Sequence, residues 1–310
     1  MAKYICIILI TVWLFPALDA QKLRVATYNI RNENSGDVKN GNGWKQRCPV
    51  IVQLIRFHDF DIFGAQEVLY GQLNNILEKL SEYGYIGVGR DDGDKAGEFA
   101  PIFYKKAILK PLQTGHFWLS EIEDKPNKGW DAALSRICTW GKFQINETDK
   151  IVWFFNLHMD HIGVKARLES SKLVIQKIKT MCSGEPVILT GDFNVDQTSD
   201  GYKYIVSSGI LSDSYETSLI RYSTNGTFNN FDANLKTDSR IDHIFTGKAF
   251  QVSRYGVLTD SYRSEIDSSA KDIKSANFPK EVSLHQYISR LPSDHFPVMV
   301  EVLLTPNPEK

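Results

Sequence analysis

The chain has 310 residues, of which 42% are hydrophobic and 24% charged, so it can bury a substantial core. Its formal net charge is −1 and no basic block occurs along it, which weakens, without excluding, a protein that grips nucleic acid through many phosphate contacts. The length suits one large or two small domains, and no linker-like stretch divides the chain.

The first residues have the pattern of a secretory signal peptide. Lys3 precedes the apolar run Tyr4–Leu18 and the small residue Ala20, after which cleavage is expected. The run is too short to span a membrane comfortably, and no later segment is long and apolar enough, so no membrane insertion is expected. We therefore predict a signal peptide over 1–20, a single domain over 21–310, and a secreted or periplasmic location.

Three cysteines would remain after cleavage: Cys48, Cys138 and Cys182. An odd count without paired spacing does not describe a disulfide scaffold, so one bridge at most is possible.

The first part of the chain predicts strands and helices in alternation. Lys22–Asn29 alternates as a strand does, and the Gly- and Asn-rich stretch 32–43 is typical of a loop. Trp44–Phe57 predicts a helix, because its proline falls early, where it is tolerated, and its apolar residues form one stripe. Asp61–Ala65 is the next apolar run, and Leu69–Tyr83 is spaced as an amphipathic helix.

Short strands dominate the rest of the chain. The next predicted strands are Tyr85–Gly89, Pro101–Tyr104, Ile108–Thr114, Ser135–Gln144 and Ile151–Asn156. A second long helix is expected over Val164–Met181, then a buried strand beginning at Pro186 and a short helix near Tyr202–Ser207. The last predicted strands are Arg240–Phe245, Phe250–Leu258 and Phe296–Leu304, while the polar stretch Thr259–Leu291 suits a surface excursion. Helices separated by many strands fit two sheets packed face to face with helices outside.

Polar side chains end several of these apolar runs. The run that begins at Pro186 stops at Gly191-Asp192-Phe193-Asn194, and side-chain alternation would aim Asp192 and Asn194 the same way at the edge of a sheet. The same kind of residue stands at other strand ends, namely Asn29, Glu67, His158, and Asp294 with His295, and Asp242 lies just before apolar residues. Each alone has a structural explanation, such as capping a helix, bonding a turn or pairing with a neighbour. A shared site at one rim of the sheets explains them together.

This set resembles the endonuclease/exonuclease/phosphatase superfamily, the phosphoesterases that include DNase I-like nucleases and inositol-phosphate phosphatases. The matching motifs, in the order the family has them, are Thr27-Tyr28-Asn29-Ile30, Gln66-Glu67, Asn156-Leu157-His158, Gly191-Asp192-Phe193-Asn194, Arg240-Ile241-Asp242-His243 and Ser293-Asp294-His295. The resemblance covers the chain from about Leu23 to Leu304 and implies a DNase I-like α/β fold, a four-layer α/β/β/α sandwich of two mainly antiparallel sheets with outer helices. The run from His158 through Asp160 and His161 to Gly163 and Arg167 is similar to a branch with secreted bacterial members.

The resemblance, with the needs of phosphoryl transfer, implies a role for each residue. Mg²⁺ (or Mn²⁺) would be held by Glu67, with Asn29 and Asp294 nearby. Asp192 would take the proton from the attacking water, and Asn194 would fix the phosphate or that water. Donors to the phosphate would be His295, with its tautomer set by Asp242, and His158.

A rival assignment makes Asp192 and Asn194 ligands of a second metal. Arg31 stands where many nucleases of the family place an acid, which leaves the metal site dependent on Asn29, Glu67 and Asp294.

Four cationic side chains are candidates for holding a second anionic group of the substrate: Arg31, Arg90, Arg136 and His161. Salt bridges of purely structural value explain each of them equally well. Trp118 and Trp130 could stack on a sugar or base, although core packing explains Trp118 as well, and His243 and Trp140 are expected to be structural.

We therefore predict a secreted, divalent-metal-dependent phosphoesterase that hydrolyses a phosphodiester or a phosphomonoester, small or saccharide-linked, by attack of a water that the metal and an Asp activate. An extracellular nuclease is the alternative enzyme, although nucleic acid is not the favoured partner. A catalytically inactive binding protein on the same fold is the alternative of another class, which the intact set of acids disfavours, because buried unpaired carboxylates are costly. No obligate protein partner is evident, and the stretch 259–291 lacks the apolar hairpin that would enter a bilayer.

Overall fold

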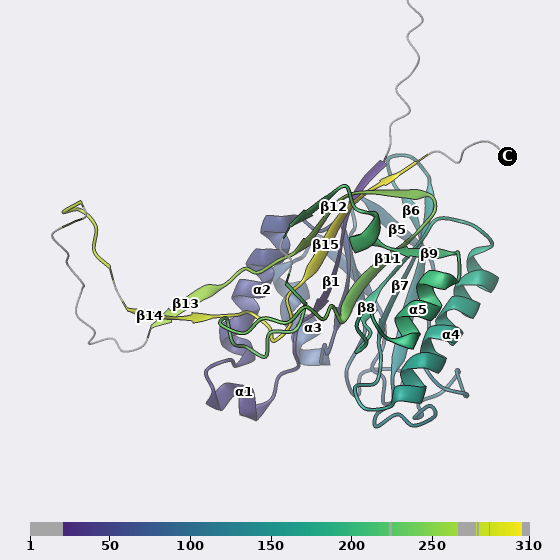
Figure 1. The fold of residues 1–310 in the computed structure, drawn as a ribbon, viewed down its shortest axis with the longest axis horizontal. Coiled ribbons are helices and arrows are strands. Elements are labelled where there is room, and N and C mark those ends of the chain that lie inside the picture. The colour runs from purple at the N-terminus through teal and green to yellow at the C-terminus, as the bar shows by residue number, and fades with distance from the viewer. Residues whose placement is uncertain (1–20, 223–224, 266–276, 278, 285, 306–310) are drawn as a thin grey trace, which may run out of the picture.

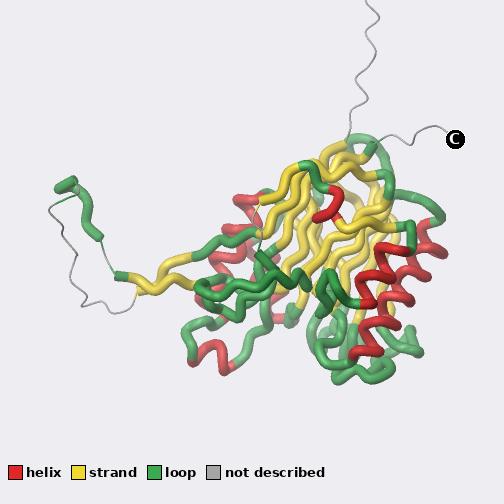
Figure 2. Tube along the Cα trace, viewed as in Figure 1, coloured by secondary structure: helices red, strands yellow, loops and turns green. Residues whose placement is uncertain are grey.

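The computed structural model describes residues 21–222, 225–265, 277, 279–284 and 286–305 (Figure 1). The predicted signal peptide lies outside the described residues. Two sheets pack face to face, and helices cover their outer faces (Figures 1 and 2). The predicted four-layer α/β/β/α sandwich is therefore confirmed.

Both sheets are mixed and mainly antiparallel. The first has the strand order β10 (Ile220–Tyr222), β12 (Phe250–Val257), β15 (Val298–Leu304), β1 (Gln21–Asn29), β2 (Ile62–Gln66), β4 (Ile102–Lys105) and β3 (Tyr83–Ile86). The second has the order β5 (Leu109–Trp118), β6 (Ile137–Ile145), β7 (Ile151–His158), β8 (Val187–Asp192), β11 (Asp242–Gly247) and β9 (Leu211–Asp213). The parallel neighbours are β1 with β2, β7 with β8, and β10 with β12.

The helices form the two outer layers. The helices α2 (Trp44–His58) and α3 (Tyr70–Lys79) lie beside the first sheet, and α4 (Val164–Cys182) and α5 (Asp200–Ser207) beside the second (Figure 1). Two shorter helices, α1 (Ser35–Lys39) and α6 (Ser214–Thr217), lie in connections.

Alternation along the strands divides the core. On β1, Leu23 and Val25 pack between the two sheets, whereas Ala26 and Tyr28 pack beneath α2 and α3. On β8, Ile188 joins the central core, whereas its neighbours Val187 and Leu189 pack against α4. Strands buried on both faces explain the nearly continuous apolar runs in the sequence. Cys48, Cys138 and Cys182 are buried and free.

Some predicted elements differ from the structure. The stretch 32–43, expected to be a loop, contains α1, whose N-cap is the Asn34 side chain accepting a hydrogen bond from Asp37 N. The helix expected to reach Tyr83 ends at Lys79, because Tyr83 already pairs with Lys105 in the first sheet. The short elements β9, α6 and β10 were not predicted.

The described part of the stretch 259–291 leaves the body of the molecule. It contains β13 (Tyr262–Glu265) and β14 (Tyr287–Arg290), which form a projecting hairpin (Figure 1). At its base, Arg290 Nη1 donates to Asn40 O (3.1 Å) and Asn42 Oδ1 (2.9 Å). Among the described residues, no helix is long and apolar enough to cross a membrane.

Candidate active site

The topology brings the polar strand ends to one rim. Because β1 and β2 are parallel, as are β7 and β8, their carboxyl ends lie at the same edges of the two sheets. β11 and β15 run antiparallel to these strands, so the segments that precede or begin them lie at that rim too. In the register of the second sheet, for example, Asp242 on β11 lies opposite Asp192 on β8, and His158 on β7 lies opposite Asp192 on the other side. Residues far apart in the sequence therefore meet.

The backbone turns sharply just after three of the strands. Arg31 (φ 59°), Glu67 (φ 59°) and Asn194 (φ 49°) all adopt the left-handed conformation, which costs energy for a residue with a Cβ. β8 therefore ends at Asp192, and Asn194 lies beyond the strand. Contrary to the expectation from the sequence, strand alternation does not determine where the Asn194 side chain points. Asn194 N instead donates to Asp192 Oδ1 (3.0 Å), and its Nδ2 donates to Met159 O (3.0 Å).

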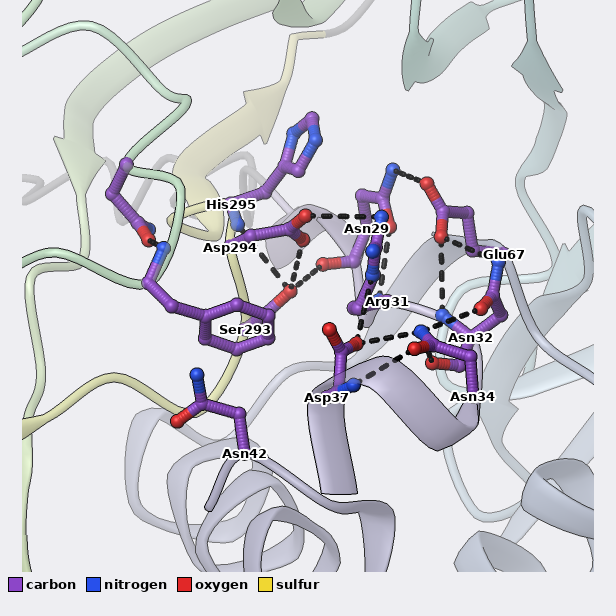
Figure 3. A network of polar contacts seen from close by, with 12 residues as sticks. Asn29, Arg31, Asn32, Asn34, Asp37, Asn42, Glu67, Ser293, Asp294 and His295 are labelled. Carbon is purple, nitrogen blue, oxygen red and sulfur yellow. Dashed lines mark hydrogen bonds and ion pairs between the residues drawn. The ribbon is translucent and has the colours of Figure 1, made fainter. Parts of the chain in front are cut away.

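Asn29 lies at the centre of the site and is fully buried. Its Nδ2 donates to Glu67 Oε1 (3.1 Å) and to Asp192 Oδ2 (2.9 Å), and so links the rims of the two sheets. Glu67 also accepts from the backbone and side-chain nitrogens of Asn32, both at 3.1 Å. Figure 3 shows Glu67 and Asp294 on either side of Asn29 and Arg31.

The carboxylates of this group fit a divalent cation. Burial raises the pKa of Asp294, and the nearby charge of Glu67 adds to the effect, while His295 and Arg31 oppose it. Arg31 Nη1 lies 3.3 Å from Asp294 Oδ2 and supplies part of the countercharge. Carboxylate and amide oxygens are the ligands that Mg²⁺ prefers. The carboxylates of Glu67 and Asp294 could therefore hold a divalent cation, and Asn29 Oδ1, which accepts from Arg31 N (3.0 Å), could add a neutral ligand.

A second group joins Asp192, Asp242 and His295. His295 Nδ1 lies 2.9 Å from Asp242 Oδ2, and His295 Nε2 lies 3.9 Å from Asp192 Oδ2. Burial would lower the pKa of His295, but the two carboxylates outweigh it and hold that pKa well above its ordinary value. Burial, reinforced by Asp242, raises the pKa of Asp192 to about 7. One ligand atom from each residue lies within 4.8 Å of the others, so these three side chains could also hold a metal.

His158 is a neutral donor beside Asp192. Its Nε2 lies 3.5 Å from Asp192 Oδ2, and its Nδ1 has no hydrogen-bond partner within the described part of the chain. Burial, with the nearby charges of Arg136 and Arg90, holds the pKa of His158 well below its ordinary value. A neutral imidazole carries one N–H, which can donate to a bound oxygen.

These groups line a cavity of about 620 Å³. Of the residues predicted from the sequence, those on its wall are Arg31, Glu67, Arg136, His158, His161, Asp192, Asn194, Asp294 and His295. Asn29 and Asp242 are not on the wall and are fully buried. Arg90 does not line the cavity, because its guanidinium binds Glu98 (2.5 Å), which does.

Arg136 contacts the carboxylate of Asp160 and, through a second nitrogen, the ring of His161. Arg136 Nε lies 3.4 Å from Asp160 Oδ2, and its Nη2 lies 3.1 Å from His161 Nδ1. Arg136 Nη1 is buried and has no hydrogen-bond partner among the described residues, whereas the residue as a whole lines the cavity.

Some wall residues were not predicted from the sequence: Asn32, Asp37, Asn40, Asn42, Glu98, Leu134, Phe228, Asn230 and Phe231. Four of them, Asn32, Asn40, Asn42 and Asn230, are amides in loops, and the segment Phe228-Asn229-Asn230-Phe231 ends no apolar run. Trp118 is a core residue, since it is buried and its Nε1 donates to Arg90 O (2.8 Å). His243 is also structural, with Nε2 3.0 Å from Val195 O, and Trp140 packs against Trp153.

Comparison with known proteins decides the family. The model of the Endonuclease/Exonuclease/phosphatase family matches residues 26–295, most of the chain and every strand end described above. The chain belongs to this family. Among solved structures of the endonuclease/exonuclease/phosphatase family, a protein from Bacteroides thetaiotaomicron is 52% identical, with a TM-score of 0.85, over 93% of this chain and 99% of the other.

Two further proteins are similar to this chain, and one of them has a named activity. A mannosyl-6-phosphatase of Bacteroides thetaiotaomicron VPI-5482 is 54% identical, with a TM-score of 0.82, over 90% of this chain and 99% of its own. Protein L388 of Acanthamoeba polyphaga mimivirus, which is uncharacterized, is 27% identical over 83% of this chain and 91% of its own. Membership of the family, together with the phosphatase relative, supports the hydrolysis of phosphate esters as the activity of this chain.

Proposed function

We propose that this protein is an exported, divalent-metal-dependent phosphomonoesterase that removes phosphate from a phosphorylated saccharide. The observation that carries the proposal is the convergence of two pairs of residues on one cavity: the carboxylates of Glu67 and Asp294, and Asp192 beside His295. Phosphoryl transfer needs positioning and charge neutralisation, and this arrangement offers both.

The cation would be bound by Glu67 and Asp294, with Asn29 as the neutral ligand. When bound, Mg²⁺ or Mn²⁺ neutralises charge on the phosphate and polarises one of its oxygens. Arg31 pairs with both Asp294 and Asp37. Its guanidinium can therefore turn toward the phosphate and still keep one of these two carboxylates as a partner.

Asp192 is the proposed general base. It is buried, one carboxylate oxygen accepts the Asn194 N–H, and the other faces His158 and His295. A carboxylate fixed in this way can take a proton from a water that attacks phosphorus.

His295 is the proposed donor to the phosphate. Because Asp242 binds Nδ1 and keeps the ring protonated, Nε2 is left to donate to a phosphate oxygen. The neutral ring of His158 supplies a second donor on the same side.

A saccharide is the proposed partner of the phosphate for two reasons. The relative that is 54% identical is a mannosyl-6-phosphatase. The cavity is also larger than a phosphate needs, and beyond the acids its wall carries the amides Asn40, Asn42 and Asn230 with the aromatic Phe228. Uncharged amides bind hydroxyl groups, and an aromatic ring packs against the apolar face of a sugar.

The test uses the protein from Gln21 onward with Mg²⁺, Mn²⁺ or EDTA. Mannose 6-phosphate, bis(p-nitrophenyl) phosphate, plasmid DNA and RNA would be compared as substrates. We expect phosphate release from the sugar phosphate that EDTA abolishes, and an Asp192→Asn variant that is about 10²–10⁴-fold slower. Preferential degradation of DNA or RNA would contradict the proposal and favour the nuclease alternative, and wild-type turnover by Asp192→Asn would refute the role of that carboxylate.

Export is proposed from the N-terminal sequence alone. Expression of the full chain in a bacterium, followed by fractionation and N-terminal sequencing, should give a mature protein that begins at Gln21 outside the cytoplasm. An uncleaved protein that remains in the cytoplasm would contradict it.

A further inference from the structure

A second pocket adjoins the active-site cavity. It has a volume of about 410 Å³, and it shares Phe228 and Asn230 with the wall of the active-site cavity. The other residues that line it are Asn229, Leu235, Lys236, Thr237, Ser239 and Ile241. None of these other residues belongs to the active-site wall, so Phe228 and Asn230 form a partition between the two spaces.

The partition is fixed to the catalytic segment. Phe228 forms a β-bridge with His295, and its ring packs edge-on against the His295 ring with centroids 5.1 Å apart. Asn229 N and Asn230 N both donate to Asp294 O, at 2.8 and 3.2 Å. A ligand part that lies across the partition is therefore held in register with a phosphate bound at His295.

The lining of the second pocket combines apolar surface with hydrogen-bonding groups. Phe228 and Leu235 are large apolar side chains with exposed fractions of 40% and 56%. Asn229 is only 2% exposed, and its Nδ2 has no hydrogen-bond partner among the described residues, whereas its Oδ1 accepts from Phe231 N (2.8 Å). A buried amide donor without a partner is costly unless a ligand or water satisfies it.

We propose that the second pocket binds the sugar unit next to the phosphorylated one, so that the substrate is a phosphorylated oligosaccharide. A pyranose presents an apolar face and a ring of hydroxyl groups, which matches the exposed Phe228 and Leu235 together with the free Asn229 donor. Lys236 is the only charged residue that lines the pocket in the described part, and its Nζ already pairs with Asp238 Oδ1 (3.0 Å), so a neutral ligand fits the pocket better than a second phosphate. This inference rests on the proposed sugar phosphatase activity.

The test compares substrates that differ by one sugar. The holoenzyme with Mg²⁺ would be assayed on mannose 6-phosphate and on mannobioses that carry the 6-phosphate on the non-reducing sugar. Because binding energy from a remote part of the substrate can be used in the transition state, we expect kcat/KM to be about tenfold higher for at least one disaccharide. Leu235→Trp, at an exposed position, should fill the pocket and bring the ratio of the two kcat/KM values down to about one.

Leu219→Trp is the matched control, because Leu219 is 70% exposed and lines neither pocket. A ratio below about threefold in the wild type, or a ratio that Leu235→Trp leaves unchanged, would overturn the inference. Equal hydrolysis of both sugars would contradict the second subsite alone, whereas no hydrolysis of either would contradict the proposed function as well. Preference for a nucleoside monophosphate over every sugar phosphate would assign the pocket to a base instead.

Discussion

At the residue scale, Asp242 shows how a side chain away from the cavity can act on it. It is fully buried and pairs with His295 Nδ1 through Oδ2, while Oδ1 has no hydrogen-bond partner within the described residues. Such a carboxylate sets the tautomer and charge of the histidine and is a positioning residue for it.

Asp242→Asn should therefore lower kcat by about 10²–10⁴-fold with little change in fold, because the amide cannot stabilise the protonated ring. Steady-state kinetics and thermal unfolding would measure both effects. If Asp242 and His295 act as one unit, the double variant Asp242→Asn/His295→Gln should be no slower than His295→Gln alone. Losses that simply multiply would mean that the two residues act independently.

Asp160 is a residue whose charge organises a loop. Its carboxylate accepts from the backbone N–H groups of Gly163 (2.8 Å), Ile162 (3.0 Å), Ala133 (3.1 Å) and Leu134 (3.1 Å). Burial would raise the pKa of Asp160, but these donors together hold it well below its ordinary value. The charged form of the Asp160 carboxylate therefore stabilises the folded state.

The pH dependence of this contribution has a definite sign. Because the folded-state pKa is depressed, the stabilisation is fully present above the unfolded value near 3.8 and is lost as pH falls below it. Asp160→Asn should lower the free energy of unfolding by about 1–3 kcal/mol at pH 7, and by less at pH 3. Urea unfolding at both pH values measures the difference, and a loss that is equal at pH 7 and pH 3 would contradict the electrostatic explanation.

At the scale of elements, α2 fixes the loops of the site through one arginine. Arg47 is fully buried, and its guanidinium donates to the carbonyls of Ile30 (2.6 Å), Asn42 (2.7 Å), Arg31 (3.1 Å) and Pro292 (3.1 Å). These carbonyls belong to the segment after β1, the loop before α2 and the segment before β15.

Arg47→Met should lower the free energy of unfolding by about 2–4 kcal/mol, because several buried carbonyl groups lose their donor. Activity should fall as well, since Arg31 and Asp294 lie in the segments that Arg47 joins. Lys45→Met on the exposed face of α2 is the control and should change stability by less than about 0.5 kcal/mol. Equal stability of the two variants by urea unfolding would show that the buried guanidinium does not hold the loops.

The elements also show what the sequence could and could not predict. β1 was predictable from its alternation, and β8 from a short apolar run bounded by Pro186 and Gly191, because these signals act locally. The polar residues that end them were predictable as one site, because parallel strands align their carboxyl ends. The loop of Phe228 and Asn230 was not predictable, because hydrogen bonds and a β-bridge to Asp294 and His295 place it, and these contacts are distant in sequence. The sequence motifs likewise do not reveal that Arg90 pairs with Glu98 and does not line the cavity.

At the scale of the whole molecule, the site lies where the rims of the two sheets meet. Asn29 on β1 donates to Asp192 on β8, and below it Asn156 on β7 accepts from Gln66 Nε2 on β2 (2.7 Å). Gly64 leaves the room for this contact, because a Cβ there would lie 2.1 Å from Asn156 Oδ1. Polar bonds thus join the two sheets beneath the carboxylates.

A cation at this junction should stabilise the whole fold. If Mg²⁺ or Mn²⁺ binds the folded state alone, a concentration one hundred times its Kd adds about 2.7 kcal/mol, which in a domain of this size raises Tm by about 4–5 °C. Thermal unfolding with metal and with EDTA measures the shift. A Tm that is the same in both would contradict a metal site.

Variants can assign the shift to one of the two carboxylate groups. If the cation is held by Asn29, Glu67 and Asp294, Glu67→Gln should abolish the shift while His295→Gln keeps it. If the cluster of Asp192, Asp242 and His295 holds it, the outcome reverses, and Asp192 could no longer be a free base. Glu169→Gln, a change at a partly exposed position on α4 outside both carboxylate groups, is the control and should keep the full shift. Loss of the shift in both site variants would indicate that the two groups bind metal together.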